Sequence, residues 1–125
     1  MDLYSMTTTH TETHTIDATG KRLGRVATEV ATILMGKHRA DCVKNRVPDV
    51  LVTVDNASKL LIDERKRTGK VYQRYSGYPG GLKECTMAKV IEKKGYEEVV
   101  RKAVYGMLPN NRLRAPRMKK LTVND

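Results

Sequence analysis

The clearest helical pattern in the chain lies at residues 23–34, which read Leu-Gly-Arg-Val-Ala-Thr-Glu-Val-Ala-Thr-Ile-Leu. Its apolar residues recur at intervals of three and four, the spacing that places side chains on one face of an α-helix. They are Leu23, Val26, Ala27, Val30, Ala31, Ile33 and Leu34. Gly36 follows, and glycine commonly ends helices. The pattern predicts a helix from about Arg22 to Met35 with one buried stripe.

A short strand is predicted on each side of this helix. Thr15–Ala18 precedes it, and the nearly continuous apolar run Val50–Val54 follows it. A run of this kind suits a strand buried on both faces. Strand, helix and strand in this order predict a right-handed parallel unit, and Leu121–Val123 is a further short strand. We therefore expect an α/β fold with three α/β/α layers around a small, mostly parallel four-stranded sheet.

A basic β-hairpin is expected to extend from this sheet. Lys59–Asp63 and Val71–Tyr75 read as its two arms, and residues 65–70, Arg-Lys-Arg-Thr-Gly-Lys, as its tip. Further along, Thr86 can cap a short helix that runs to about Lys94. A second helix is predicted from Tyr96 to Met107, followed by a basic tract from Arg112 to Lys120.

The length of 125 residues fits one domain. Residues 1–13 are rich in Thr and His and poor in apolar residues, so we expect a flexible leader there and a single domain over residues 14–125. No apolar run approaches membrane-spanning length, and the N-terminus lacks the apolar core of a signal peptide. The sequence thus predicts no membrane partner.

The charge distribution points to a polyanionic partner. Lys and Arg number 24 and Asp and Glu number 14, which gives a net charge of 24 − 14 = +10. Residues 65–83 contain six cations and no acid, and residues 99–124 contain seven cations and no acid. Long windows without acids are typical of proteins that neutralise nucleic-acid phosphates.

A loop rich in glycine and tyrosine occupies residues 74–83, which read Arg-Tyr-Ser-Gly-Tyr-Pro-Gly-Gly-Leu-Lys. Glycines allow a partner to approach the backbone, and tyrosines offer flat faces to ribose and bases. The alternative is a surface turn whose tyrosines cap the core. Gly24, in the first turn of the predicted helix, has a similar role: close approach to a strand or to RNA.

Metal and disulfide sites are not predicted. Cys42 and Cys85 form no CxxC motif, and two thiols are too few for a disulfide scaffold. His10 and His14 are four residues apart, as are His38 and Cys42, but neither pair has a second ligand pair nearby in the sequence.

Catalytic and cofactor motifs are also weak. Gly20 and Gly24 lack the third glycine of a dinucleotide fingerprint. Asp17, Asp49 and Asp55 lie near strand ends, and we interpret them as caps and turns. No cofactor and no small-molecule substrate are predicted.

Several motifs agree in order and spacing with one known family. They are Asp17–Thr28, Gly36–His38, Tyr75–Lys83, Gly106–Pro109 and Asn110–Leu113. From about Ile16 to Val123 the chain resembles ribosomal protein thirteen of the large subunit, in its bacterial form. Two segments depart from the family pattern. Residues 45–50 lack the usual Asp-Thr-Gly-Asp, and Leu113-Arg114-Ala115 replaces Leu-Gly-Arg.

The resemblance implies a three-layer α/β fold without catalytic activity. It also implies a cytoplasmic location in the large subunit of a bacterial or organelle-type ribosome, and a role in early subunit assembly. The expected partners are large-subunit ribosomal RNA and neighbouring ribosomal proteins, without obligate homo-oligomers. Two alternatives stay open: a small α/β enzyme acting on RNA or a nucleotide, and a free RNA-binding regulator.

Charge, loop composition and resemblance together predict one set of RNA-binding residues. They are Lys21, Arg22, Arg25, Lys37, His38, Arg39, Arg65, Lys66, Arg67, Lys70, Arg74, Tyr75, Ser76, Gly77, Tyr78, Gly80, Gly81, Lys83, Met107, Leu108, Pro109, Asn110, Arg112, Arg114, Arg117 and Lys119.

Overall fold

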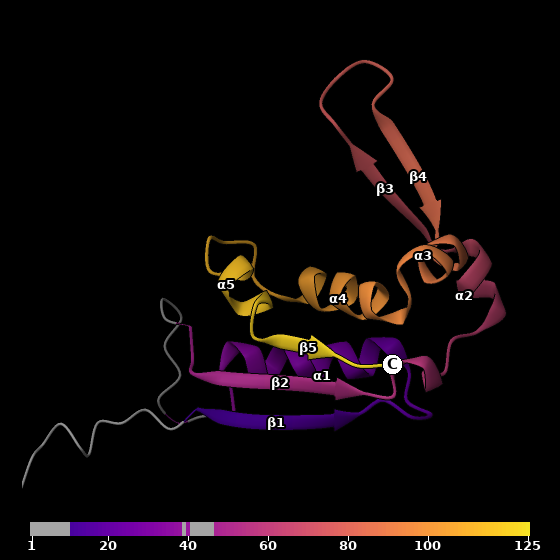
Figure 1. Cartoon of the computed structure of the whole chain (residues 1–125). Coiled ribbons are helices and arrows are strands. Elements are labelled where there is room, and N and C mark those ends of the chain that lie inside the picture. Colours follow the sequence, from indigo (N-terminus) through magenta and orange to yellow (C-terminus); the bar gives the residue numbers. More distant parts are fainter. Residues whose placement is uncertain (1–10, 39, 41–46) are drawn as a thin grey trace, which may run out of the picture.

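The structure is a computed structural model that describes residues 11–38, 40 and 47–125 (Figure 1). Its elements run in the following order: β1 (Glu12–Asp17), α1 (Leu23–Met35), β2 (Val50–Asp55), a 3-10 turn (Ala57–Lys59), α2 (Glu64–Gly69), β3 (Val71–Tyr75), β4 (Leu82–Thr86), α3 (Met87–Lys94), α4 (Tyr96–Met107), α5 (Arg114–Met118) and β5 (Leu121–Val123). Strand β1 starts earlier than the predicted Thr15. The first ten residues of the predicted leader lie outside the described residues.

The sheet of the domain has the strand order β1-β2-β5, and both strand pairs are parallel. Thr15 pairs with Thr53, and Val54 pairs with Val123. The predicted α/β class with a mostly parallel sheet is confirmed. In the described part of the chain this sheet has three strands, one fewer than predicted.

The core lies between the sheet and helices α1 and α4. Val50, Val52 and Val54 point to this side from β2 and have no exposed surface. Helix α1 buries six of the seven predicted apolar residues, namely Leu23, Val26, Ala27, Val30, Ala31 and Leu34, and Ile33 lies at the rim. Helix α4 adds Val99, Val100 and Val104. The helical pattern therefore predicted the buried face of α1 correctly.

The opposite face of the sheet is more open than expected. Leu51 is 44% exposed, and Thr13, Thr15 and Thr122 are also exposed. Because α1 and α4 pack against each other on one side, the described residues form two layers rather than the predicted three. The apolar sequence of β2 alone did not reveal this open face. The neighbouring strands contribute threonines to the same face, and threonine side chains tolerate contact with water.

The hairpin is displaced along the sequence from its predicted position. Its arms are β3 and β4, with Arg74 opposite Lys83, and residues 76–81 form its tip. The expected tip instead contains helix α2. Glu64 in the first turn and Lys66 and Arg67 in the last complement the helix dipole, which explains a helix at this position. Within the described residues, the predicted first arm contributes a single β-bridge, from Leu61 to Arg22.

The remaining helices follow their predicted boundaries closely. The Lys89 backbone N–H donates to Thr86 Oγ1 at 3.4 Å, so Thr86 caps α3 as expected. Gly95 separates α3 from α4 with a φ of 78°. The predicted basic tract includes the short helix α5. Among the helices of the described residues, none combines the length and the hydrophobicity that a membrane span requires.

We predict that Val30→Asp unfolds the domain or nearly so. Val30 is wholly buried on α1, and an unpaired charge in the core costs about 4 kcal/mol or more. Thr28→Ala, on the exposed side of the same helix, should change the free energy of unfolding by about 1 kcal/mol or less. Thermal and urea unfolding of both variants provide the measurement, and equal losses would show that the packing face is wrong.

Candidate nucleic-acid interface

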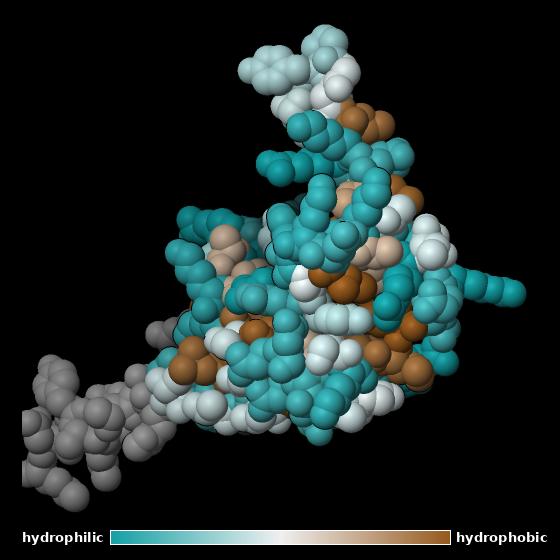
Figure 2. Space-filling model, turned by 45° about the vertical axis from the view of Figure 1, so that its right-hand side comes forward, coloured by the Kyte–Doolittle hydropathy of each residue, from teal (hydrophilic) through white to brown (hydrophobic). Residues whose placement is uncertain are grey.

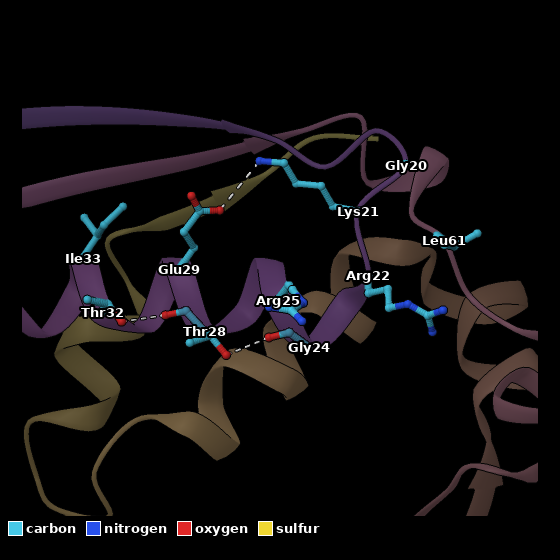
Figure 3. A pocket seen from close by; sticks show the side chains of 10 residues that line it. All are labelled: Gly20, Lys21, Arg22, Gly24, Arg25, Thr28, Glu29, Thr32, Ile33 and Leu61. Carbon is cyan, nitrogen blue, oxygen red and sulfur yellow. Dashed lines mark hydrogen bonds and ion pairs between the residues drawn. The ribbon is translucent and has the colours of Figure 1, made fainter.

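A concavity of about 950 Å³ opens beside the start of α1 (Figure 3). It is lined by Gly20, Lys21, Arg22, Gly24, Arg25, Thr28, Glu29, Thr32, Ile33 and Leu61. The threonines donate their hydroxyl protons to helix carbonyls, Thr28 to Gly24 O and Thr32 to Thr28 O, both at 2.8 Å. The basic side chains therefore supply the chemistry of this surface.

The three cations at the concavity are weakly held by the protein. Lys21 Nζ lies 3.8 Å from Glu29, and Arg22 Nη1 lies 3.5 Å from Asp63. All four side chains are about half exposed or more, and exposed pairs of this kind contribute little stability. Arg25 is exposed and makes no ion pair with a described residue. These side chains can therefore turn to an external phosphate at small cost.

The N-terminus of α1 adds backbone donors to the same surface. Its N-cap residue, Arg22, makes no capping side-chain hydrogen bond, and the first turn contains no acid. Free N–H groups and the positive end of the helix dipole favour an anion here. A Cβ added at Gly24 would meet nothing within 4 Å. Close packing against a strand therefore does not explain this glycine, and approach by an outside partner stays a prediction.

The glycine-tyrosine loop forms the tip of a hairpin that projects from the body (Figure 1). Tyr75 is 64% exposed and Tyr78 is 74% exposed. The interpretation of these tyrosines as caps of the core is therefore wrong. Gly77 and Gly80 have positive φ angles of 89° and 73°, so the turn itself requires them.

Gly81 is explained by the geometry of the tip alone. The Gly81 N–H donates a hydrogen bond of 2.9 Å to the carbonyl oxygen of Tyr78, which closes the turn. A Cβ added at Gly81 would lie only 2.9 Å from the same oxygen, which is too close. Close approach of RNA is not needed to account for this glycine.

A basic groove of about 240 Å³ lies at the base of the hairpin, between it and helices α3 and α4. It is lined by Tyr72, Gln73, Arg74, Lys83, Glu84, Cys85, Val90, Lys93, Lys94 and Lys102. Lys102 Nζ lies 5.0 Å and Lys70 Nζ 5.7 Å from the centre of the Tyr72 ring, within range of cation–π attraction. Burial raises the pKa of the Tyr72 hydroxyl. Figure 2 shows hydrophilic side chains gathered over the hairpin stem and the surface below it.

Three lysines of this groove were not predicted from the sequence to contact RNA: Lys93, Lys94 and Lys102. Lys93 and Lys94 end α3, where lysines also suit the helix dipole, and Lys102 looks like a solvated position of α4. The packing of α3 and α4 at the base of the hairpin brings these lysines to the same groove as Arg74 and Lys83.

The C-terminal basic tract is only partly at the surface. The Arg114 guanidinium stacks 3.7 Å from the centre of the Tyr105 ring and donates to its hydroxyl at 2.7 Å. Leu108 and Arg117, which were predicted to bind RNA, are 3% and 2% exposed because they pack inside the fold. Neither can contact RNA in this conformation, which corrects the prediction for both residues.

The tract on α2 also divides into exposed and packed cations. Arg65 and Lys66 are exposed. Arg67 is partly buried and its Nη2 donates to the Tyr96 hydroxyl at 3.5 Å. Its replacement would disturb packing as well as charge.

Most other predicted contact residues lie at the surface. Lys37, Ser76, Met107, Pro109, Asn110, Arg112 and Lys119 are exposed. His38 is also exposed, and its Nε2 lies 3.0 Å from Glu12 Oε2. Arg39 lies outside the described residues.

The acids at the strand ends make structural hydrogen bonds. Asp17 Oδ1 accepts from the Thr19 N–H at 3.0 Å, the Thr19 hydroxyl at 2.7 Å and the Asn56 amide at 3.0 Å. Asp55 accepts from the Asn124 amide at 3.0 Å. Asp49 accepts from the Thr11 hydroxyl at 3.0 Å. Their interpretation as caps and turns fits this geometry.

The Thr19 and Asn56 hydrogen bonds lower the pKa of Asp17 from 3.8 to about 2. The carboxylate therefore stabilises the fold above pH 3.8, and this stabilisation is lost as the pH falls towards 2. We predict that Asp17→Asn lowers the free energy of unfolding at neutral pH. Urea unfolding across this pH range should show the deficit shrinking on acidification, whereas a constant deficit would contradict the assignment.

Tyr78→Ala should leave folding almost unchanged. The side chain is mostly exposed, so the free energy of unfolding should change by less than about 0.5 kcal/mol. Val104→Ala, in the buried stripe of α4, is the matched control and should cost roughly 2 kcal/mol or more. Urea unfolding provides the measurement. A comparable loss in the free energy of unfolding in both variants would show that Tyr78 is part of the core.

Comparison with known proteins adds an independent finding. Residues 11–125 match the family described as Ribosomal protein L13. The chain is 46% identical over 108 residues to large ribosomal subunit protein uL13 of Thermus thermophilus, an alignment that covers 86% of this chain and 76% of the relative. It is 44% identical over 108 residues to the protein of the same name from Syntrophotalea carbinolica, covering 86% and 75%. The chain therefore belongs to the ribosomal protein L13 family.

Proposed function

We propose that this chain is a structural, non-enzymatic constituent of the large ribosomal subunit and binds its ribosomal RNA. Family membership supports the ribosomal role, because the similar proteins carry the name of a large-subunit protein. The observation that carries RNA binding is the uncapped N-terminus of α1, where Lys21, Arg22 and Arg25 border an open concavity. The cellular place is then the cytoplasm, within a ribosome of bacterial or organelle type.

The proposed contacts act mainly through phosphates and shape. Double-stranded RNA has a deep, narrow major groove, so side chains recognise its backbone and minor-groove surface. A phosphate at the start of α1 would receive backbone N–H groups and arginine hydrogen bonds together. Lysines in the groove beneath the hairpin would neutralise further phosphates along the chain. These contacts would hold the protein on folded RNA without reading much sequence.

The hairpin tip has a different part in the proposal. Tyr75 and Tyr78 are exposed on a thin extension, and such side chains can enter spaces between RNA segments that a globular surface cannot reach. Stacking of an unpaired base or a ribose on one ring would contribute about 1–3 kcal/mol. An extension that penetrates between RNA segments also suits early subunit assembly, because it must be placed before the RNA closes around it.

The two other functions receive less support. An enzyme acting on RNA or a nucleotide would need converging titratable groups in a pocket. The concavity at α1 has instead one acid, Glu29, paired with Lys21. A free RNA-binding regulator could use the same cations, but it does not account for the family membership.

Replacing Gly24 with Ala separates RNA contact from folding. The new methyl group would meet open space in the protein, and Ala raises helix stability relative to Gly by up to about 1 kcal/mol. We predict a melting temperature equal to or above that of the wild type, with weaker binding to large-subunit ribosomal RNA in a filter assay. Unchanged affinity together with higher stability would show that RNA does not approach α1 at this turn.

Replacing Arg25 with Ala tests the charge contribution. We expect weaker RNA binding and a plot of log affinity against log salt that is flatter by about 0.7–0.9 for each phosphate that the variant no longer neutralises. Glu98→Gln, which removes a charge of opposite sign on α4, is a control for the general effect of net charge. An unchanged slope in Arg25→Ala would exclude a phosphate from this site.

A further inference from the structure

A cluster of metal-ligating side chains lies where β1 begins and α1 ends, at the opposite end of α1 from the basic concavity. One of its members, His38, is also among the residues predicted from the sequence to contact RNA. Glu12 Oε2 is 3.2 Å from His14 Nε2 and 3.0 Å from His38 Nε2. One ligand atom from each of the three residues lies within 4.8 Å of the others. The two imidazole rings meet edge to face, with their centres 5.0 Å apart. In the sequence, His14 was paired with His10 and His38 with Cys42, and neither pair predicted a metal site. The fold brings His14 and His38 together.

The backbone fixes these three side chains from both sides. Glu12 and His14 are two residues apart on β1, so they point to the same face of the strand. The Glu12 N–H donates to the Asp49 carbonyl at 3.2 Å, which holds the first residue of β1 beside β2. The cluster therefore starts from a strand position that the sheet already determines.

The end of α1 places the third ligand. Gly36 adopts a left-handed conformation with a φ of 76° and donates its N–H to Ile33 at 3.0 Å, and the Lys37 N–H donates to Thr32 at 3.2 Å. A Cβ at Gly36 would lie 3.2 Å from the Pro48 ring, so the turn sits tightly against the residues that precede β2. This closed turn directs the chain at His38 towards β1.

We propose that Glu12, His14 and His38 bind a Zn²⁺ ion. Two imidazoles and one carboxylate are ligands that zinc accepts readily, and three protein ligands leave a fourth position for water. Zinc–ligand bonds of about 2.0–2.1 Å in a tetrahedron separate neighbouring ligand atoms by roughly 3.3 Å. The two distances to Glu12 Oε2 are close to that value.

Access and charge fit the same proposal. The side chains of Glu12, His14 and His38 are 40%, 33% and 28% exposed, so the ion and its water ligand can reach them. The carboxylate supplies one negative charge to offset the charge of the ion. The bound ion would join the start of β1 to the chain beyond α1, two segments far apart in the sequence, and so stabilise the fold.

The competing interpretation is a carboxylate that hydrogen-bonds two histidines without any metal. Titration of the complete chain with Zn²⁺ distinguishes the two. The protein should carry no histidine tag, be stripped with a chelator and be kept reduced. We expect one saturable Zn²⁺ per chain by isothermal titration calorimetry and a rise in melting temperature as Zn²⁺ is added.

Variants assign the ligands. His14→Ala and His38→Ala should each weaken Zn²⁺ binding by at least about tenfold, because removal of groups that merely orient ligands already costs 10–100-fold. Glu12→Gln, of the same shape, should also weaken it. Glu29→Gln and Cys85→Ser, whose side chains lie outside the cluster, should bind Zn²⁺ as the wild type does. Circular dichroism tests whether each variant is folded. If a histidine-to-alanine variant does not fold, His38→Gln is measured in its place.

Two results would overturn the proposal. The first is a wild-type chain whose melting temperature and calorimetric signal do not respond to Zn²⁺, which would leave the hydrogen-bonded interpretation. The second is equal Zn²⁺ affinity in the wild type and in the folded histidine variants, which would move the metal elsewhere in the chain.

Discussion

The packing of α1 against the inner face of β2 is the interaction on which the rest of the structure depends. Val26 and Val30 on the helix and Val52 and Val54 on the strand have no exposed surface. Burial of a side chain of this size contributes about 1.5–3 kcal/mol relative to exposure. Helix α4 then completes the core against α1. Since α1 is held rigidly by this packing, its basic N-terminus can present a fixed array of donors.

From this core the basic surfaces extend in separate directions. One begins at the first turn of α1, a second lies beneath the hairpin, and a third follows α4 into the C-terminal tract. Each is attached to an element anchored in the core, whereas the hairpin tip projects away from the body (Figure 1). The stability of the domain and its proposed binding of RNA therefore depend largely on different residues. The exposed cations, such as Arg25, can be exchanged at small cost to folding, whereas the buried valines cannot.

Sequence reasoning predicted the elements whose signals are local. The three-and-four spacing of α1, the Thr86 cap of α3 and the glycine breaks at Gly36 and Gly95 each depend on neighbours a few residues away. Strand pairing is different, because any of several apolar runs can pair with Val71–Tyr75. The glycine turn at residues 76–81 decides in favour of β4, while Glu64 and its cations make the preceding segment a helix.

The candidate site shows the same limit. Acid-free windows indicated a basic protein and contain about half of the exposed cations of the described residues. They could not distinguish Arg117, buried in the fold, from Arg112 at the surface. Burial depends on where the tract packs after it leaves α4. The lysines beneath the hairpin and the Glu12-His14-His38 cluster were missed because each joins segments that are distant in the sequence. Only the three-dimensional fold contains that information.

The central claim is that this chain is held on large-subunit ribosomal RNA by its basic surfaces. Sedimentation of ribosomal subunits from cells that express the chain, with and without a high-salt wash, tests it most directly. A constituent anchored at several surfaces stays with the large subunit after the wash, because many simultaneous phosphate contacts and an embedded hairpin must be released together. The claim would be contradicted if the chain were recovered in the soluble fraction under both conditions, while large subunits that are otherwise complete did not contain it.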